Sequence, residues 1–329
     1  RKYSKMNITQ SNMKMWSVIG TRATFGITAL EMAESVGNLI ILTGDTSTSA
    51  GLDRFRKTYP SKFLEIGIAE QNMMGIAAGL ASEGFQVFTT TFAPFQTMRC
   101  CEQIKVNLGY MRQKVCFVGL ASGVVLGTLG YTHCCIEDVG IIRSIPGITV
   151  VSPADCTETV KATLAAVDHE ESVYLRLTGG ARNPQVYKED YDFEIGKAIT
   201  LKEGDDVTIF ASGTMVHEAL QASETLSEQN IFAAVVNMHT LKPIDVSSVR
   251  KACMKSKLIV TIEEHSIIGG LGSAIAECKA TLLNTPPQLF LGLPNEYGKS
   301  GEYKFILEEN GLSALPIAKK IKKYYKNLG

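Results

Sequence analysis

Short apolar runs alternate with amphipathic stretches along most of the chain. The runs are apolar throughout, which predicts strands buried on both faces, and the stretches between them have helical periodicity. This alternation is typical of parallel sheets covered by helices and predicts an α/β fold. The predicted strands span 38–42, 86–92, 114–120, 147–153, 172–177, 206–212, 231–238, 257–264 and 288–293, and the predicted helices span 69–83, 93–109, 155–170, 214–229 and 271–283.

The composition changes around residues 178–205, which are polar, contain glycine and have little periodicity. This segment is the best candidate for a domain boundary, so we expect domains at 1–190 and 191–329. The lysine-rich segment 315–329 is expected to be a helix with a solvated face rather than a binding patch.

The charge balance excludes several functional classes. The 329 residues are 45% hydrophobic, and 33 basic side chains match 33 acidic ones. Proteins that bind nucleic acids or membrane surfaces usually have a basic excess, so neither partner is expected. No apolar run approaches the roughly 18–20 residues of a membrane span, and no secretory leader is recognisable. We therefore expect a cytoplasmic enzyme or enzyme subunit.

The eight cysteines form no C-x-x-C pair, and most lie in apolar segments. They are expected to be buried thiols, with His133 before Cys134 only a weak metal signal, and we expect no metal ligands in this chain. Neither G-x-G-x-x-G nor a P-loop is present. The glycine turn 269–272 could bind an anion at a helix N-terminus, but a tight turn is the favoured interpretation.

Glu70 is the unusual residue of the apolar helix 69–83, which follows the strand-like FLEIGI. An acid is favourable in the first turn of any helix, because the free N–H groups and the dipole attract negative charge. A carboxyl that begins a buried helix can also serve chemistry. The local pattern leaves both interpretations open.

Four segments, taken together and in order, resemble the second half of thiamine-diphosphate-dependent transketolases. They are GDTSTSAGLDRF, FLEIGIAEQNMMGIAAGLASEGFQVFTTTFAPFQTMR, GTLGYTHCCIEDVGIIRSIPGITVVSPAD and IEEHSIIGGLGSAIAE. The resemblance extends from about residue 12 to residue 325 and is greatest to the split transketolases, which consist of two polypeptides. It implies a pyrimidine-binding domain followed by a transketolase C-terminal α/β domain.

The resemblance assigns Glu70 to the aminopyrimidine ring of thiamine diphosphate. In the family, a glutamate at this place hydrogen-bonds a ring nitrogen and favours the tautomer that takes the thiazolium proton, which generates the reactive carbanion. Phe92 and Phe95 match the aromatic wall against which the ring stacks, and Asp45 matches an acid near the cofactor. Met98 replaces a common tyrosine, and its thioether can still pack on a ring.

The resemblance also implies substrate contacts. His133 matches a histidine that hydrogen-bonds the substrate beside the reacting carbon, and Arg22 and Ser49 match groups that hold a sugar phosphate. A structural role for His133 and a surface salt bridge for Arg22 remain alternatives. Ala121 and Leu129 replace a phosphate-binding histidine and a sugar-binding acid, and Arg176 is an uncertain match to a second phosphate arginine. A different ketose, with fewer phosphates, is therefore a hypothesis.

The implied reaction transfers a two-carbon ketol unit from a ketose or ketose phosphate to an aldose. The family binds the diphosphate through Mg²⁺ in a separate domain that nothing in this sequence matches. We therefore expect an N-terminal partner subunit to supply the Mg²⁺ site, a heterotetramer by family analogy, and no turnover by this chain alone. The C-terminal domain is expected to make dimer contacts, with His265 in a turn.

Two alternatives remain. The chain could be the beta chain of another thiamine diphosphate enzyme, either the decarboxylating component of a 2-oxoacid dehydrogenase or a deoxyxylulose-phosphate synthase-like enzyme. It could also be a non-catalytic scaffold subunit.

Overall fold

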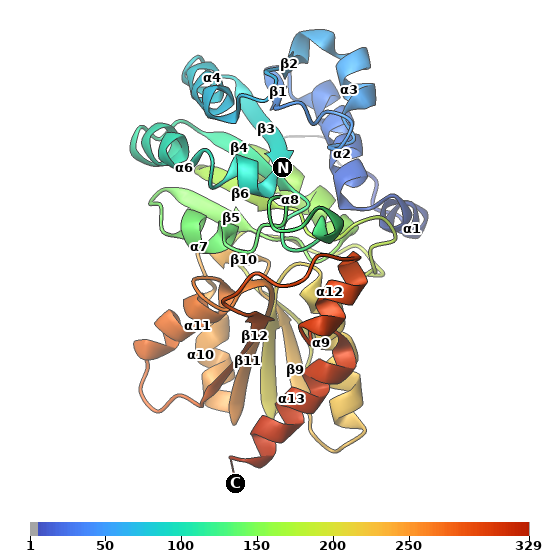
Figure 1. The fold of residues 1–329 in the computed structure, drawn as a ribbon, viewed down its shortest axis with the longest axis vertical. Helices are drawn as coiled ribbons and strands as arrows, with labels where there is room; N and C mark the ends of the chain where they lie inside the picture. The colour runs from blue at the N-terminus through green and yellow to red at the C-terminus, as the bar shows by residue number, and fades with distance from the viewer. Residues whose placement is uncertain (1–5, 329) are drawn as a thin grey trace.

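The computed structural model describes residues 6–328 and contains two sheets, one in each half of the molecule (Figure 1). The ends of the two expected domains, residues 1–5 and residue 329, lie outside the described residues. The first sheet has the strand order β10-β5-β6-β4-β3-β1-β2. Its strands are β1 (Leu39–Thr43), β2 (Phe63–Glu65), β3 (Gln86–Phe92), β4 (Val115–Leu120), β5 (Ile148–Val151), β6 (Ser172–Arg176) and β10 (Thr240–Lys242).

The second sheet has the strand order β12-β11-β8-β9-β7. Its strands are β7 (Ile199–Lys202), β8 (Val207–Ala211), β9 (Ala233–Asn237), β11 (Leu258–Ser266) and β12 (Gln288–Leu293). Neighbouring strands are parallel except at one edge of each sheet, where β10 pairs antiparallel with β5 and β7 pairs antiparallel with β9. The predicted α/β fold is confirmed, and β10 adds a strand from the second half of the chain to the first sheet.

Helices surround both sheets, and most of the predicted ones are present. They are α1 (Gln10–Ile19), α2 (Thr21–Ser35), α3 (Asp53–Thr58), α4 (Glu70–Ser82), α5 (Ala93–Gln96), α6 (Cys101–Gln103), α7 (Asp138–Arg143), α8 (Cys156–Asp168), α9 (Met215–Ser227), α10 (Val246–Lys255), α11 (Leu271–Ala280), α12 (Tyr303–Glu309) and α13 (Ala314–Lys326).

The single helix predicted over residues 93–109 is wrong. The chain forms α5, a turn, α6 and then a π-helix at Ile104–Tyr110. The π-helix keeps Ile104 and Leu108 in the core, whereas the turn brings Arg99 to the end of the sheet. Periodicity did not reveal this break, because α5 packs on β3 and β4 whereas α6 and the π-helix pack on α4.

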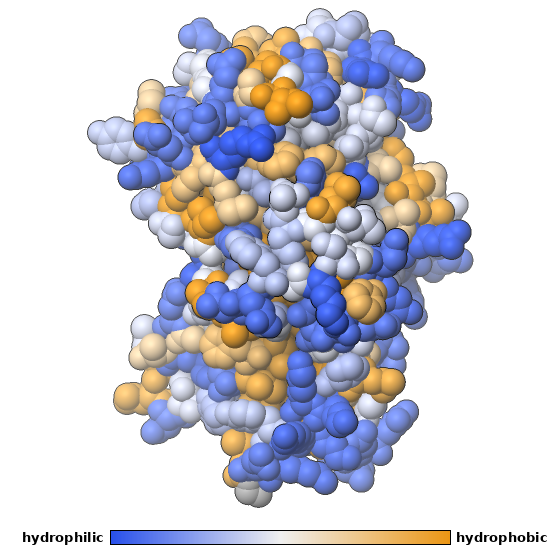
Figure 2. Space-filling model, in the orientation of Figure 1, coloured by the Kyte–Doolittle hydropathy of each residue, from blue (hydrophilic) through white to orange (hydrophobic). Residues whose placement is uncertain are grey.

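The core consists of strands that are buried from end to end. Every residue of β1, β4, β5, β6, β8, β9 and β11 is buried, as expected for strands with helices on both faces. All eight cysteines are free thiols, and six of them are buried. Lys319, Lys320, Lys323 and Lys326 of α13 are exposed, and Figure 2 shows the hydrophilic surface over this helix.

The two domains meet through a buried polar network. Arg176 Nε donates to Asp138 Oδ2 at 2.7 Å, and its Nη2 donates to the backbone oxygen of Glu264 at 2.9 Å. The Glu264 carboxylate accepts from the backbone N–H of Val124 at 2.8 Å and from the Tyr303 hydroxyl at 2.6 Å. Asp138, Arg176 and Val124 belong to the first domain and Glu264 and Tyr303 to the second, so the bonds from Arg176 and Val124 to Glu264 join the domains.

Among residues 6–328, no helix is both long enough and apolar enough to cross a bilayer.

Candidate active site

The strands β1, β2, β3 and β4 are parallel, so their carboxyl ends lie together at one end of the first sheet. We call this end the carboxyl edge of the sheet. In open α/β sheets this edge is where ligands bind. The segments that leave it carry Asp45 after β1, Glu70 after β2, Phe95 after β3 and His133 after β4. Residues that are far apart in the sequence are thus brought to one edge.

Glu70 is the first residue of α4, and its side chain is only 2% exposed. The space beside it depends on Gly44, because a Cβ at that position would lie 3.2 Å from Glu70 Cγ. Oε2 accepts a hydrogen bond from Arg99 Nη1 at 2.8 Å. Glu70 therefore lies in the first turn of α4 and is buried at the carboxyl ends of the strands, and its role in chemistry stays a prediction.

Three rings form a cluster next to Glu70. The centroids of Phe95 and His133 are 5.5 Å apart, and those of Phe92 and Phe95 are 6.3 Å apart, both with steep interplanar angles. Arg99 connects this cluster to Glu70, because its guanidinium carbon lies 4.1 Å from the centre of the Phe95 ring. The structure thus places Glu70, Phe92, Phe95 and His133 in one continuous cluster.

The backbone fixes the position of His133. Its N–H donates to Gly130 at 3.0 Å, and Gly123 and Cys135 exchange two backbone hydrogen bonds that hold both ends of the loop. His133 Nδ1 lies 3.0 Å from the Thr132 hydroxyl. The second domain supports the same loop, because the Gly301 N–H donates to the oxygen of Gly127 at 3.0 Å.

Asp45 and Met98 lie at the exposed margin of the cluster. Asp45 has a left-handed backbone with φ 57°, and its N–H donates to Glu65 Oε1 at 2.8 Å. Glu65 also accepts the N–H of Gly67 at 3.0 Å, so one carboxylate orders the chain on both sides of this edge. Met98 is directly before Arg99 and is exposed.

Arg22 and Ser49 lie on neighbouring segments. The loop that carries Ser49 packs on α2, since a Cβ at Gly51 would lie 3.0 Å from the oxygen of Arg22. Burial lowers the pKa of Arg22. No carboxylate forms an ion pair with it among residues 6–328, so the alternative of a surface salt bridge finds no partner there.

The residues that depart from the transketolase pattern have three different environments. Ala121 follows β4, is buried and has a left-handed φ of 51°. Leu129 is 55% exposed on the loop before His133. Arg176 is buried at the domain joint with Asp138, so it is not available as a phosphate ligand. The uncertain match of Arg176 to a phosphate arginine is therefore wrong.

Two residues of this region, Arg99 and Glu65, are not marked by any motif of the sequence. The only signal for Arg99 was its place after Met98, and Glu65 was only the third residue of the strand-like FLEIGI. Their roles depend on contacts with residues from other elements, which no local pattern contains.

Two expectations about the second domain need revision. His265 lies in β11 and is buried, so its assignment to a turn is wrong. The glycine turn 269–272 leads into α11, whose N-terminus binds an internal carboxylate. Glu263 accepts the N–H of Leu271 at 2.6 Å and of Gly272 at 2.8 Å. An anion site and a tight turn are thus combined, and the anion is the chain's own.

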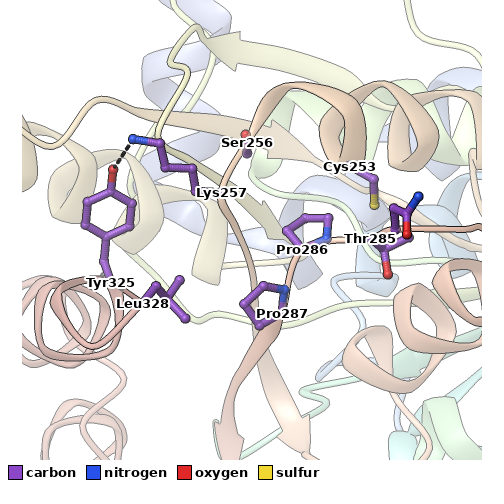
Figure 3. Close-up of a pocket in the computed structure, with 9 residues that line it drawn as sticks. Cys253, Ser256, Lys257, Thr285, Pro286, Pro287, Tyr325 and Leu328 are labelled. Atoms are coloured by element: carbon purple, nitrogen blue, oxygen red, sulfur yellow. Dashed lines mark hydrogen bonds between the residues drawn. The ribbon is translucent and has the colours of Figure 1, made fainter.

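A cavity of about 450 Å³ lies at the end of the second sheet away from the first domain (Figure 3). Lys257 and Pro287 line it and come directly before β11 and β12, so it is at the amino ends of these strands. Lys257 Nζ donates to the Tyr325 hydroxyl at 3.3 Å. No group of three or more potential metal-ligating His, Cys, Asp or Glu side chains occurs in the described part of the chain.

Comparison with known proteins adds two matches to family models. The pyrimidine-binding domain of transketolase matches residues 17–182, and the transketolase C-terminal domain matches residues 196–317. A subunit of the apulose-4-phosphate transketolase of Phocaeicola vulgatus is 40% identical over 305 residues, which are 92% of this chain and 96% of the relative. A 6-deoxy-6-sulfo-D-fructose transketolase subunit from a Clostridium species is 39% identical over 301 residues, or 91% and 92% of the two chains.

Two solved structures are similar throughout the chain. A split-gene transketolase, described as an inactive beta4 tetramer, has a TM-score of 0.84 and 35% identity over 94% of this chain and 98% of the other. The Campylobacter jejuni transketolase has a TM-score of 0.77 at 22% identity, which shows a shared fold. The match covers 93% of this chain but only 46% of that one.

Proposed function

The chain belongs to the transketolase family, and on that premise we propose that it is the pyrimidine-binding and C-terminal subunit of a split transketolase. The observation that carries the proposal is the buried Glu70 carboxylate at the carboxyl edge of the first sheet, in one cluster with Phe95 and His133. The split relatives support the same proposal, because the match covers nearly their whole length.

The cluster fits an aminopyrimidine ring. A buried carboxylate accepts a hydrogen bond from a flat nitrogen-containing group, and aromatic and thioether side chains suit a flat ring. Glu70 would share a proton with the ring nitrogen, Phe92, Phe95 and Met98 would pack against the ring, and Asp45 would lie at its margin. When bound, thiamine diphosphate supplies the carbanion that carries a two-carbon unit.

On the substrate side, we assign His133 to a hydrogen bond with the sugar beside the reacting carbon. Its imidazole can donate or accept a proton near neutral pH, and the Gly130 and Thr132 contacts fix its place. Arg22 and Ser49 would bind an anionic or hydroxylated part of the substrate, since the guanidinium has no described carboxylate partner. The transferred unit would pass from a ketose or ketose phosphate to an aldose.

The side chains at the sugar-contacting positions bear on the identity of the sugar. Ala121 and Leu129 offer no hydrogen-bonding side chain, and Arg176 is paired with Asp138. Arg22 is thus the main candidate cation that this chain offers to a phosphate. Relatives with comparable identity are named for apulose 4-phosphate and for a sulfo-sugar, which supports an unusual ketose as the donor.

The proposed enzyme is completed by a second polypeptide. The chain matches subunits of split transketolases over nearly their whole length, which supports an N-terminal subunit that would bring the diphosphate and Mg²⁺ ligands. The related split-gene protein is inactive as a beta4 tetramer, which is consistent with a need for that partner. We propose a heterotetramer with the active site between the two kinds of subunit.

Calorimetry tests this proposal. Thiamine diphosphate and Mg²⁺ are titrated into this chain alone, into its mixture with the candidate N-terminal subunit, and into the mixture with Glu70→Ala. The proposal is supported if the wild-type mixture binds the cofactor and neither this chain alone nor the Glu70→Ala mixture binds it.

Tight binding by this chain alone would reveal an unrecognised diphosphate site and contradict the split enzyme. If the two chains associate but bind no cofactor, the chain is a scaffold subunit. If the mixture binds the cofactor but decarboxylates 2-oxoacids instead of transferring ketol units, it is another enzyme of the cofactor class.

A further inference from the structure

Arg99 makes two contacts that belong together chemically. Its Nη1 is 2.8 Å from Oε2 of Glu70, and its guanidinium carbon is 4.1 Å from the centre of the Phe95 ring. One flat cation therefore donates to the buried carboxylate and covers the aromatic ring at the same time. Among the described residues, Arg99 is the charged partner of Glu70.

These two contacts are the ones that the proposed function assigns to the aminopyrimidine. A guanidinium and an aminopyrimidine are both planar, donate N–H groups at the edge and stack on aromatic faces. Phe92 and His133 meet Phe95 at interplanar angles of 77° and 71°, so neither stacks on it. Arg99 covers the Phe95 ring, on which neither of them stacks. The guanidinium and the aminopyrimidine therefore cannot occupy this ring face and Glu70 Oε2 at the same time.

The side chain of Arg99 can leave without a change in the main chain. It is 41% exposed and comes from the turn between α5 and α6. The backbone oxygen of Arg99 accepts Gln71 Nε2 at 3.0 Å, which ties the turn to α4 independently of the guanidinium. Rotation of the side chain alone would therefore uncover both Glu70 and Phe95.

We propose that Arg99 occupies the aminopyrimidine position in the cofactor-free protein and swings outward when the cofactor binds. This inference rests on the proposed function and adds a regulatory contact to the same site. Until the cofactor arrives, the contact gives the buried carboxylate a donor and covers the apolar ring. Cofactor binding is correspondingly weakened, because it must first displace Arg99.

The test uses the complex of this chain with its N-terminal subunit and measures the Kd of thiamine diphosphate in excess Mg²⁺ by calorimetry. Arg99→Met keeps the length of the side chain but removes the ion pair, and Arg99→Gln removes the charge but keeps a flat polar end. Both variants should bind the cofactor about 3- to 10-fold more tightly, since a partly exposed ion pair and a cation–π contact no longer compete.

The matched control is Lys255→Met, which removes an ion-paired cation of similar exposure, 38%, from the second domain. Its Kd should equal that of the wild type, and circular dichroism confirms that each variant is folded. If the wild type binds the cofactor and either folded Arg99 variant binds it equally or more weakly, Arg99 is no placeholder and this inference alone is overturned. If the wild-type complex binds no cofactor, the proposed function falls and takes the inference with it.

Discussion

The carboxyl ends of the strands are partly open to solvent in the first sheet and buried in the second. The first edge presents Asp45 and Met98 to solvent and collects Glu70, Phe95 and His133. The corresponding edge of the second sheet is covered by the first domain. Its polar residues Asn237, His239, Glu263, Glu264 and His265 are all buried.

The difference shows how the same architecture serves two purposes. At the carboxyl ends of the second sheet, the polar side chains bond to other groups of this chain, as Asn237 does to Glu158 and Glu264 to Val124. Glu263 caps the N-terminus of α11, and desolvation raises its pKa to about 7. Burial also lowers the pKa of His265 to about 4. The second edge is therefore a joint between domains, and we expect variants there to change stability and variants at the first edge to change activity.

The largest effect is expected from breaking the joint. Asp138→Asn would leave Arg176 as a buried cation without its carboxylate, which should lower the free energy of unfolding by about 3–5 kcal/mol. Urea denaturation of this chain measures the loss. The control is Asp205→Asn, which breaks an exposed pair with Lys255 and should leave the free energy of unfolding nearly unchanged. Equal losses in the two variants would show that the buried network does not stabilise the protein.

At the open edge, His133→Gln should reduce kcat in the reconstituted complex by about 10- to 100-fold. That is the loss expected from one hydrogen bond to a charged or developing group, about 1.5–3 kcal/mol. The free energy of unfolding should change by less than about 0.5 kcal/mol, because the histidine is partly exposed. His217→Gln, on α9, is the matched control. If His133→Gln lowered the free energy of unfolding as much as Asp138→Asn does, the expected difference between the two sheets would be wrong.

The joint should also weaken in acid through His265. Its folded pKa of about 4 is below the unfolded value of about 6.5, so the unfolded chain binds the proton first as the pH falls. Asp138, Glu263 and Arg176 surround this ring. The stability advantage of the wild type over His265→Asn should shrink by about 1 kcal/mol between pH 6.5 and 5.5.

Urea denaturation of both proteins at several pH values measures this difference. Titration of Glu263 contributes to both proteins and largely cancels. A difference that stays constant or widens in acid would mean that His265 is protonated in the folded state.

The smallest change in stability is expected at Lys299, which lies outside the buried contacts between the domains. Lys299 pairs with Glu309 in the second domain, and its side chain is 74% exposed. Lys299→Ala should lower the free energy of unfolding by less than about 0.5 kcal/mol in the same denaturation measurement. A loss above about 1 kcal/mol would extend the joint to the segment that contacts the His133 loop.

Much of the fold was predictable from local pattern. Apolar runs such as 114–120 are strands, and the helix that begins near Glu70 is present. The helix predicted over residues 93–109 was wrong, because its two parts pack on different surroundings. The domain boundary near residue 190 and the roles of the site residues stay predictions.

Within the candidate site, residue types and order carried the resemblance, and the structure added partners. Motif context pointed to Glu70, Phe95 and His133, which the fold brings together. Arg99 and Glu65 had no such signal, and Arg176 had a misleading one. Each of the three is defined by a partner at least 20 residues away in the sequence.

The sequence by itself determined the alternation of strands and helices, the buried thiols and the family motifs, because these depend on local hydrophobicity and on residue identity at fixed spacing. Only the tertiary structure decided which sheet has exposed carboxyl ends, that the Glu70 carboxylate contacts Arg99, and that Arg176 is buried between the domains. Those outcomes depend on distances and desolvation between distant segments, and these arise only when the two domains pack.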